Sequence, residues 1–212
     1  MKVDDSHVKN TAAVYDRIAL SYAKKNEAYA LIPEQNKWLK LLPQRSLILD
    51  VACASGRDSE FFLKHGLEVI GIDLSPKLLA IAKKRLPRVK FLLQDIRKLK
   101  FPNQYFDGIW ANAILHHLKR SEIPKVIKQF YRLLKPQGWL FVAVHEGRGE
   151  REVTDQLSPV FPRHYTYLNQ QELRTWLETP GFELLDLSVW NEKDRHPQHR
   201  DLSVLTCFAR KP

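Results

Sequence analysis

The segment from Leu47 to Asp58 constrains the fold of this chain most strongly. An apolar run, Leu47–Leu49, leads into Asp50, and a loop of small residues, Ala52–Gly56, then opens a polar segment that begins with Arg57 and Asp58. A buried parallel strand followed by a short loop and a helix has this order of residues. Small side chains let the backbone approach a bound molecule, and the unpaired amides at the start of the helix face it. The segment therefore predicts a βα unit with a ligand site at the end of its strand.

Asp73 indicates what kind of ligand this site takes. It ends the next apolar run, 68–72, roughly 20 residues after the loop, where an acidic side chain is well placed to hydrogen-bond the hydroxyls of a ribose. A dinucleotide site needs glycine at the first, third and sixth loop positions. Counted from Ala52, the sixth residue is Arg57, and Gly56 is the fifth. The sequence also has no Gly-x-x-x-x-Gly-Lys-Ser phosphate loop. A cofactor with adenosine, an amino-acid tail and no phosphates fits better, and S-adenosylmethionine (SAM) is such a molecule.

These residues and the motifs that follow them resemble the class I SAM-dependent methyltransferases. Residues 47–58 resemble the family's motif I, which commonly reads Asp-x-Gly-x-Gly-x-Gly, and Asp73 resembles its ribose-binding acid. Residues 89–96 are similar to the third-strand motif, whose acid, here Asp95, contacts the adenine amino group in the family. Residues 106–118 and 133–140 resemble the fourth-strand motif and the turn before the fifth strand. The likeness covers about residues 10–145 in order, which no single motif would establish.

The resemblance implies a Rossmann-like α/β fold, with a seven-stranded, mostly parallel sheet, one antiparallel C-terminal strand and helices on both faces. It also implies SAM as the cofactor and S-adenosylhomocysteine (SAH) as the product. The expected cofactor-binding residues are Tyr15, Tyr22, Asp50, Ala52, Cys53, Ala54, Gly56, Arg57, Asp73, Leu74, Asp95, Ile96, Ala111 and Asn112. Tyr29 continues the spacing of the first two, but we expect it to pack in the core. Ala52 and Ala54 replace the usual glycines, and alanine does not adopt a positive φ cheaply. We expect cofactor binding to survive, with the methionine tail slightly displaced.

Strand and helix patterns alternate from residue 47 to residue 144, as in parallel βαβ units. Helices are expected at 58–65, 75–85, 122–134 and 170–178, the last capped by Asn169. Strands at 182–190 and 202–209 flank the polar segment 191–200, which fits no helix, so they are expected to pair antiparallel. We expect a single domain, with a helical lid at 1–45 over the cofactor edge, a cofactor-binding core at 46–145 and an acceptor-side region at 146–212.

Composition agrees with a soluble globular enzyme, because the 212 residues are 44% hydrophobic and 27% charged. The segment Met1–Asp5 lacks the apolar region of a secretory signal, and no apolar run approaches the ~20 residues that span a bilayer. The two cysteines, Cys53 and Cys207, imply no disulfide framework. A reduced cytoplasmic enzyme is the simplest expectation.

Histidines are the candidate catalytic residues. Methyl transfer from a sulfonium depends largely on holding donor and acceptor in line at about 3–3.5 Å, and a general base adds typically ~10²–10⁴-fold where the acceptor must lose a proton. His116, with His117 as the second choice, follows the fourth strand and can take such a proton, since imidazole titrates near neutrality. A structural or positioning role is the alternative. His145 and Glu146 form a second polar pair at the same sheet edge and are further candidates to line the acceptor pocket. The long connection 147–167 mixes cations with aromatics, and it is expected to be an acceptor lid or a surface loop.

Three functions remain open. The leading one is methylation of a small-molecule acceptor at oxygen or nitrogen. The second is methylation of tRNA, which the formal net charge of +10 favours, and the lid and histidines loosely resemble the tRNA wobble-uridine side-chain methyltransferases. Most of the clustered cations, however, fall on polar faces that are usually solvated, and no Cys/His zinc pattern or stacking-aromatic motif accompanies them. The third is a non-catalytic SAM-binding protein, which only the two alanines of motif I favour.

Overall fold

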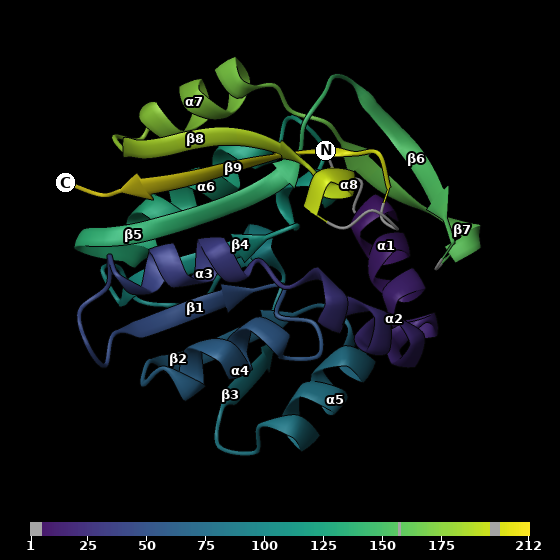
Figure 1. The fold of residues 1–212 in the computed structure, drawn as a ribbon, viewed down its shortest axis with the longest axis horizontal. Helices are drawn as coiled ribbons and strands as arrows, with labels where there is room; N and C mark the ends of the chain where they lie inside the picture. Colours follow the sequence, from purple (N-terminus) through teal and green to yellow (C-terminus); the bar gives the residue numbers. More distant parts are fainter. Residues whose placement is uncertain (1–5, 157, 196–199) are drawn as a thin grey trace.

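The computed structural model describes residues 6–156, 158–195 and 200–212. The segment Met1–Asp5, which is predicted not to be a secretory signal, and part of the polar segment 191–200 lie outside these ranges. The described residues form a seven-stranded sheet in the order β3-β2-β1-β4-β5-β9-β8 (Figure 1). Its strands are β1 (Leu47–Val51), β2 (Glu68–Asp73), β3 (Lys90–Leu93), β4 (Phe106–Asn112), β5 (Leu134–His145), β8 (Glu183–Asn191) and β9 (Ser203–Arg210). Because β9 runs antiparallel to both of its neighbours and the remaining pairs are parallel, the predicted Rossmann-like sheet with one antiparallel strand is confirmed.

Successive side chains of the central strands are buried against helices on opposite faces of the sheet. On one face, Ile48 of β1 belongs to a core with Trp38 of α3 (Ile32–Leu39) and Phe62 of α4 (Arg57–Lys64). On the other, Leu49 belongs to a core with Phe130 of α6 (Ile123–Leu133). Successive strand side chains point to opposite faces, so a continuous apolar strand needs helices on both sides. Figure 1 shows α3 and α4 in front of the strands and α6 behind them.

The helices begin and end close to where the sequence predicts them. Helix α5 (Pro76–Arg85) is capped by Ser75, whose Oγ accepts a hydrogen bond from the Leu78 amide at 3.1 Å. Helix α7 (Gln170–Glu178) begins with a capping box, in which the Asn169 side chain accepts from the Glu172 amide at 2.9 Å and the Glu172 carboxylate accepts from the Asn169 amide at 3.1 Å. These side chains satisfy amides that the first helical turn leaves without a partner.

Two expected connections contain regular structure. Residues 147–167 hold an antiparallel hairpin of β6 (Glu150–Asp155) and β7 (Ser158–Thr166). The polar segment after β8, predicted to fit no helix, contains one helical turn, α8 (Glu192–Arg195). That prediction is wrong because contacts from outside the segment hold the turn. The Arg195 guanidinium lies 3.7 Å from the centre of the Trp190 ring and 2.7 Å from a Glu34 carboxylate oxygen.

The turn predicted before the fifth strand is a bend within β5. Leu134 already pairs with Phe106, and regular pairing with β4 resumes at Trp139. Between them Gln137 has a φ of 67°, and a Cβ on Gly138 would lie 2.9 Å from the Lys135 carbonyl oxygen. The bend therefore requires glycine at position 138, because a side chain there would meet backbone.

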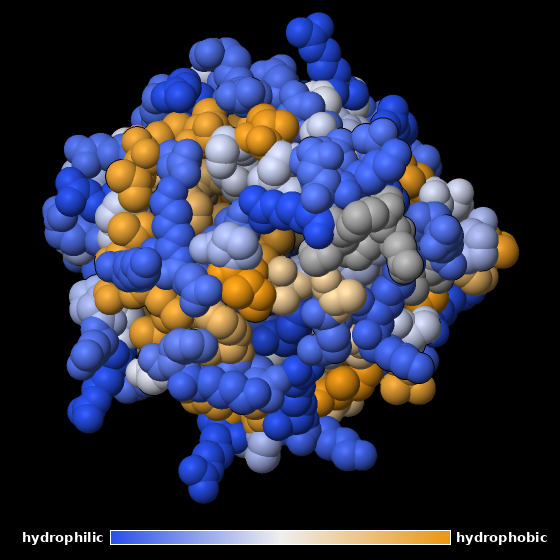
Figure 2. All heavy atoms as spheres, in the orientation of Figure 1, coloured by the Kyte–Doolittle hydropathy of each residue, from blue (hydrophilic) through white to orange (hydrophobic). Residues whose placement is uncertain are grey.

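The N-terminal helices lie at the carboxyl end of the parallel strands. Helices α1 (Ser6–Arg17) and α2 (Ala19–Asn26), followed by the short helix η1 (Glu27–Tyr29), lie beside the β6–β7 hairpin, at the end to which the arrowheads of β1 and β5 point (Figure 1). In Figure 2, hydrophilic side chains are spread around the outline of this face of the molecule and are not gathered over one element. Within the described ranges, no helix is both long enough and apolar enough to cross a membrane.

Candidate active site

A cavity of about 840 Å³ lies where the parallel strands end. Its walls come from α1, α2, the ends of β1, β2, β4 and β5, and the β6–β7 hairpin. Open α/β sheets bind their ligands outside the carboxyl ends of the strands. The volume is near the upper end of the range of about 300–1,000 Å³ for small-molecule sites. The position and size of this cavity make it the candidate active site.

The loop after β1 keeps the backbone of a glycine-rich loop although it contains alanines. Ala52 and Ala54 have φ angles of 56° and 48°, and Gly56 has a φ of 82°. Each alanine in this left-handed region costs about 1–2 kcal/mol. Ala113, which follows β4 and lines the same cavity, has a φ of 56°. Three strained alanines thus surround one cavity, as expected for backbone strain held at a functional site.

Asp73 lies at the end of β2 with its carboxylate in the cavity wall. One oxygen accepts a hydrogen bond from the Ala54 amide at 2.9 Å, and the other accepts from the Ser75 amide at 2.8 Å. Burial raises the pKa of this carboxyl above its ordinary value, against the effect of the backbone amides. Each carboxylate oxygen can accept more than one hydrogen bond, so Asp73 keeps capacity for ribose hydroxyls.

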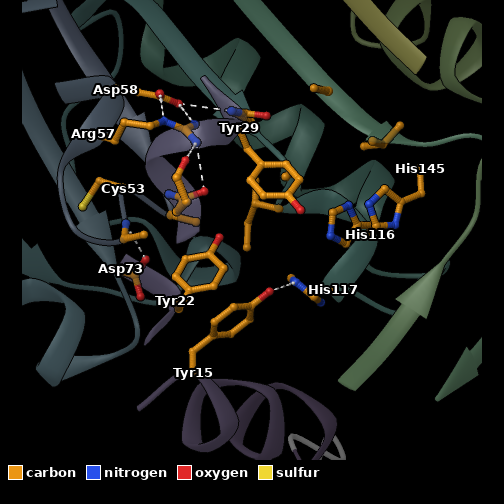
Figure 3. A pocket seen from close by; sticks show the side chains of 18 of the residues that line it. Tyr15, Tyr22, Tyr29, Cys53, Arg57, Asp58, Asp73, His116, His117 and His145 are labelled. Atoms are coloured by element: carbon orange, nitrogen blue, oxygen red, sulfur yellow. Dashed lines mark hydrogen bonds and ion pairs between the residues drawn. The ribbon is translucent and has the colours of Figure 1, made fainter. Parts of the chain in front are cut away.

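Two further acids lie at this end of the cavity. Asp50 at the end of β1 accepts a hydrogen bond from Ser59 Oγ at 2.5 Å, and burial, together with the nearby charge of Asp58, raises its pKa to about 8. Asp58 on α4 binds both Nε and Nη2 of Arg57, at 2.6 and 2.9 Å. Burial would raise the pKa of Asp58, but Arg57, whose contacts with Asp58 are drawn in Figure 3, outweighs it, so this pKa is lowered. The acidic side chains at this end supply hydrogen-bond acceptors that suit the hydroxyl and ammonium groups of a nucleoside cofactor with an amino-acid tail.

The structure brings most of the predicted cofactor-binding residues together. Those that line the cavity are Tyr15, Tyr22, Asp50, Ala52, Cys53, Ala54, Arg57, Asp73, Leu74, Ile96 and Asn112. Gly56, Asp95 and Ala111 are not among the described residues of its wall. Gly56 is the N-cap of α4, and the Asp95 carboxylate is bound by Arg97 Nη2 at 2.7 Å and caps the short helix η2 (Ile96–Lys98). Gln94 and Ile96 on either side of Asp95 face the cavity instead.

The far end of the cavity contains a cluster of histidines. The rings of His116 and His145 stack with centres 4.0 Å apart and planes at 11°, and Tyr165 lies across both (Figure 3 shows the two histidines). Burial lowers the pKa of both imidazoles well below the ordinary value. Neither Nδ1 atom has a hydrogen-bond partner among the described residues. The pair is therefore neutral and aromatic, and it lines the cavity wall together with His117. Glu146, expected to line the acceptor pocket together with His145, is not in the described cavity wall.

Several wall residues were not predicted as site residues. Tyr29, expected in the core, is half-buried and lines the cavity, so that expectation is wrong; its seven-residue spacing from Tyr22 was the available signal. Arg163 on β7 is 2% exposed and donates a hydrogen bond to the Tyr15 hydroxyl at 2.9 Å. Trp190 and Arg200 come from the C-terminal region. Nothing in their local sequence marks them, because only the tertiary fold brings β8 and β9 to this cavity.

Comparison with known proteins agrees with this site. A family described as "Methyltransferase domain" matches residues 48–138. The ubiquinone biosynthesis O-methyltransferase of Coxiella burnetii is 31% identical over 180 residues, which cover 76% of each protein. A SAM-dependent methyltransferase from Methanosarcina mazei has a similar fold, with a TM-score of 0.73, 20% identity, and coverage of 81% of this chain and 95% of that one.

A further similar structure holds the cofactor product. The Burkholderia thailandensis 1,6-didemethyltoxoflavin N1-methyltransferase, crystallised with 1,6-didemethyltoxoflavin and SAH, has a TM-score of 0.68 and 24% identity, with coverage of 94% of this chain and 88% of that one. The chain therefore belongs to the class I SAM-dependent methyltransferases. It is an enzyme that uses SAM, and the expectation drawn from motif I is confirmed.

Proposed function

We propose that this enzyme methylates an oxygen or nitrogen atom of a small molecule bound at the far end of the cavity. The observation that carries the proposal is the continuity of the cavity, whose wall includes both the Ala52–Ala54 segment and the His116–His145 pair. Most of the side chains at the far end are buried, and Tyr165 and Arg163 are 3% and 2% exposed. An enclosed end of this kind suits a compact acceptor that enters beside the cofactor. The Coxiella relative is named for an O-methylation, which supports the same class of acceptor.

The residues of the far end hold the acceptor and exclude water. Bound SAM supplies a methyl group on a positively charged sulfur, which leaves with the bonding electrons as a neutral thioether. We assign His116 as the group that takes the acceptor's proton, because it lines the cavity and its lowered pKa keeps it neutral. The same burial makes His116 a weak base, so it suits an acceptor with an acidic hydroxyl or N–H.

The positive charge of the chain is the main support for a tRNA substrate. Ion pairs with acidic side chains weaken this support, because they neutralise some of the cations. Arg85 binds the carboxylates of Glu27 and Glu60. Arg97 binds those of Asp95 and Glu122. These two arginines belong to the cluster of lysines and arginines between residues 77 and 100, and paired guanidiniums contribute less to binding phosphates. We therefore place the small-molecule acceptor first.

Transfer of labelled methyl groups into a fractionated cell extract tests this proposal. The enzyme is incubated with methyl-labelled SAM and separate metabolite, protein and RNA fractions. The Asp73→Ala variant, whose weaker cofactor binding should reduce the transfer of label, is the control. We expect label in the metabolite fraction, insensitive to ribonuclease. Label in tRNA, with an affinity that falls steeply as salt rises, would show a tRNA methyltransferase instead.

A further inference from the structure

Asp58, the last residue of the motif I segment, is the centre of a buried hydrogen-bond cluster and is not among the predicted site residues. Besides the two bonds from Arg57, its carboxylate accepts from Gln35 Nε2 at 3.0 Å, Trp110 Nε1 at 2.9 Å and Asn112 Nδ2 at 3.1 Å. The five N–H groups come from α3, α4 and β4. Asp58 is 6% exposed, so water has little access to its carboxylate, and the five N–H groups take the place of water as hydrogen-bond donors. A buried carboxylate with this many donors stays ionised.

Arg57 extends the cluster to the helices that cover the cavity. Its Nη1 donates to the backbone oxygen of Asn26 at 2.8 Å and to the side-chain oxygen of Asn26 at 2.9 Å, at the end of α2. The Arg57 side chain is 10% exposed and lines the cavity. Its charge is therefore poorly screened by water, and Asp58 is the anion in direct contact with it.

The cofactor places a cation in the same cavity. SAM carries a sulfonium in addition to its ammonium and carboxylate groups, whereas the thioether of SAH is uncharged. An uncompensated guanidinium in the cavity wall repels the sulfonium and has no such effect on the thioether. The two molecules are otherwise nearly the same in shape, so a change in the charge of the wall alters the ratio of their affinities.

We propose that Asp58 is a specificity-determining residue which, by neutralising Arg57 in the cavity wall, maintains the affinity for SAM relative to SAH. This role goes beyond packing, because a purely structural residue affects both ligands alike. The proposal also predicts that the ratio of SAM affinity to SAH affinity changes in opposite directions when Asp58 or Arg57 is replaced. Removal of the anion disfavours SAM, and removal of the cation favours it.

Calorimetric titration of SAM and SAH into three variants tests the proposal. We expect Asp58→Asn to lower the ratio of SAM affinity to SAH affinity by about tenfold and Arg57→Gln to raise it. The double variant should return the ratio to within about twofold of the wild-type value, because both charges are gone. Asp107→Asn is the matched control. This change breaks the ion pair between Asp107 and Lys135, whose charged atoms are 2.8 Å apart. Neither residue is in the described cavity wall, so the ratio should stay unchanged.

Loss of one partner of a buried pair destabilises a protein strongly, whereas loss of both is tolerated better. If Asp58→Asn does not fold, the Arg57→Gln and double variants still decide the question. A raised ratio in Arg57→Gln that returns in the double variant supports the proposal. A ratio that is the same in every folded variant, or that falls in Arg57→Gln, overturns it and leaves Asp58 with a structural role.

Discussion

The Tyr15 hydroxyl lies 2.9 Å from His117 Nε2, and it joins helix α1 to the segment after β4 across the cavity (Figure 3). His117 Nδ1 lies 3.0 Å from the His164 carbonyl oxygen, which only accepts, so Nδ1 carries the proton and Nε2 accepts from Tyr15. Arg163 donates to the same hydroxyl. Burial lowers the pKa of His117 to about 3, so the ring stays neutral. His117 is thus held as a fixed acceptor, which leaves His116 as the candidate base.

Replacement of Tyr15 by phenylalanine tests this link. The change removes one hydroxyl and leaves both Arg163 Nη1 and His117 Nε2 without that partner, in a site where unpaired polar groups cost about 1–3 kcal/mol. We expect the free energy of unfolding in urea to fall by that amount. Tyr105→Phe, at a residue that is 37% exposed, is the control and should change it by less than about 0.5 kcal/mol. Equal effects of the two variants would show that the Tyr15 hydroxyl contributes nothing specific.

The strained alanines predict an unusual response to glycine. At Ala52 and Ala54 a glycine relieves a left-handed penalty of about 1–2 kcal/mol and loses about 0.4–1 kcal/mol through the freer unfolded chain. We expect Ala52→Gly and Ala54→Gly to leave stability unchanged or slightly raised. Ala80→Gly, on the exposed face of α5, should lower it by about 1 kcal/mol. Denaturant unfolding compares the three, and a loss at Ala52 as large as that at Ala80 would mean that the loop is not strained.

The predicted ribose contact of Asp73 is tested by calorimetry with SAH. Asp73→Ala removes the acceptor, and we expect about tenfold weaker binding, since an unpaired buried donor costs about 1–3 kcal/mol. Asp95→Ala should weaken binding less, because the Asp95 carboxylate is bound by Arg97 and is not in the described cavity wall. The opposite order of the two variants would move the ribose contact away from Asp73.

The buried histidines make stability depend on pH. In the unfolded chain His117 takes up a proton near pH 6.5, whereas in the folded protein its pKa is about 3. Between these values the unfolded state binds the extra proton, so the stability associated with neutral His117 is lost as pH falls. We expect His117→Gln to reduce the slope of unfolding free energy between pH 4 and 6 by about 1.4 kcal/mol per pH unit. The exposed His65→Gln serves as the control. An unchanged slope in His117→Gln would contradict the burial of a neutral ring.

The parts of the fold that depend on local patterns follow from the sequence, and those that depend on distant contacts do not. The apolar run before Asp50 and the Asn169 cap are local, and both lie where predicted. Helix α8 was missed because Trp190 and Glu34 stabilise it from other segments.

The site divides in the same way. The end of the cavity that we propose for the cofactor is formed by loops that follow consecutive strands, so motif spacing predicts most of its wall residues. The far end is assembled from the segment after β4 and from β5, β7, β8 and β9. Its histidines and the lid segment that contains Arg163 are predicted from the sequence, whereas Trp190 and Arg200 reach the cavity only through the tertiary fold. The sequence around Asp58 does not indicate the role that we propose for it, because the helix dipole alone favours an acid in the first turn of a helix.

A crystal structure of the protein with SAH tests the central claim most directly, namely that one cavity holds the cofactor at the Ala52–Asp73 end and the acceptor at the His116 end. We predict that the ribose hydroxyls lie within hydrogen-bond distance of the Asp73 carboxylate and that the sulfur faces the space lined by His116 and Tyr165. SAH bound with its sulfur turned away from His116, or bound outside this cavity, would contradict the claim.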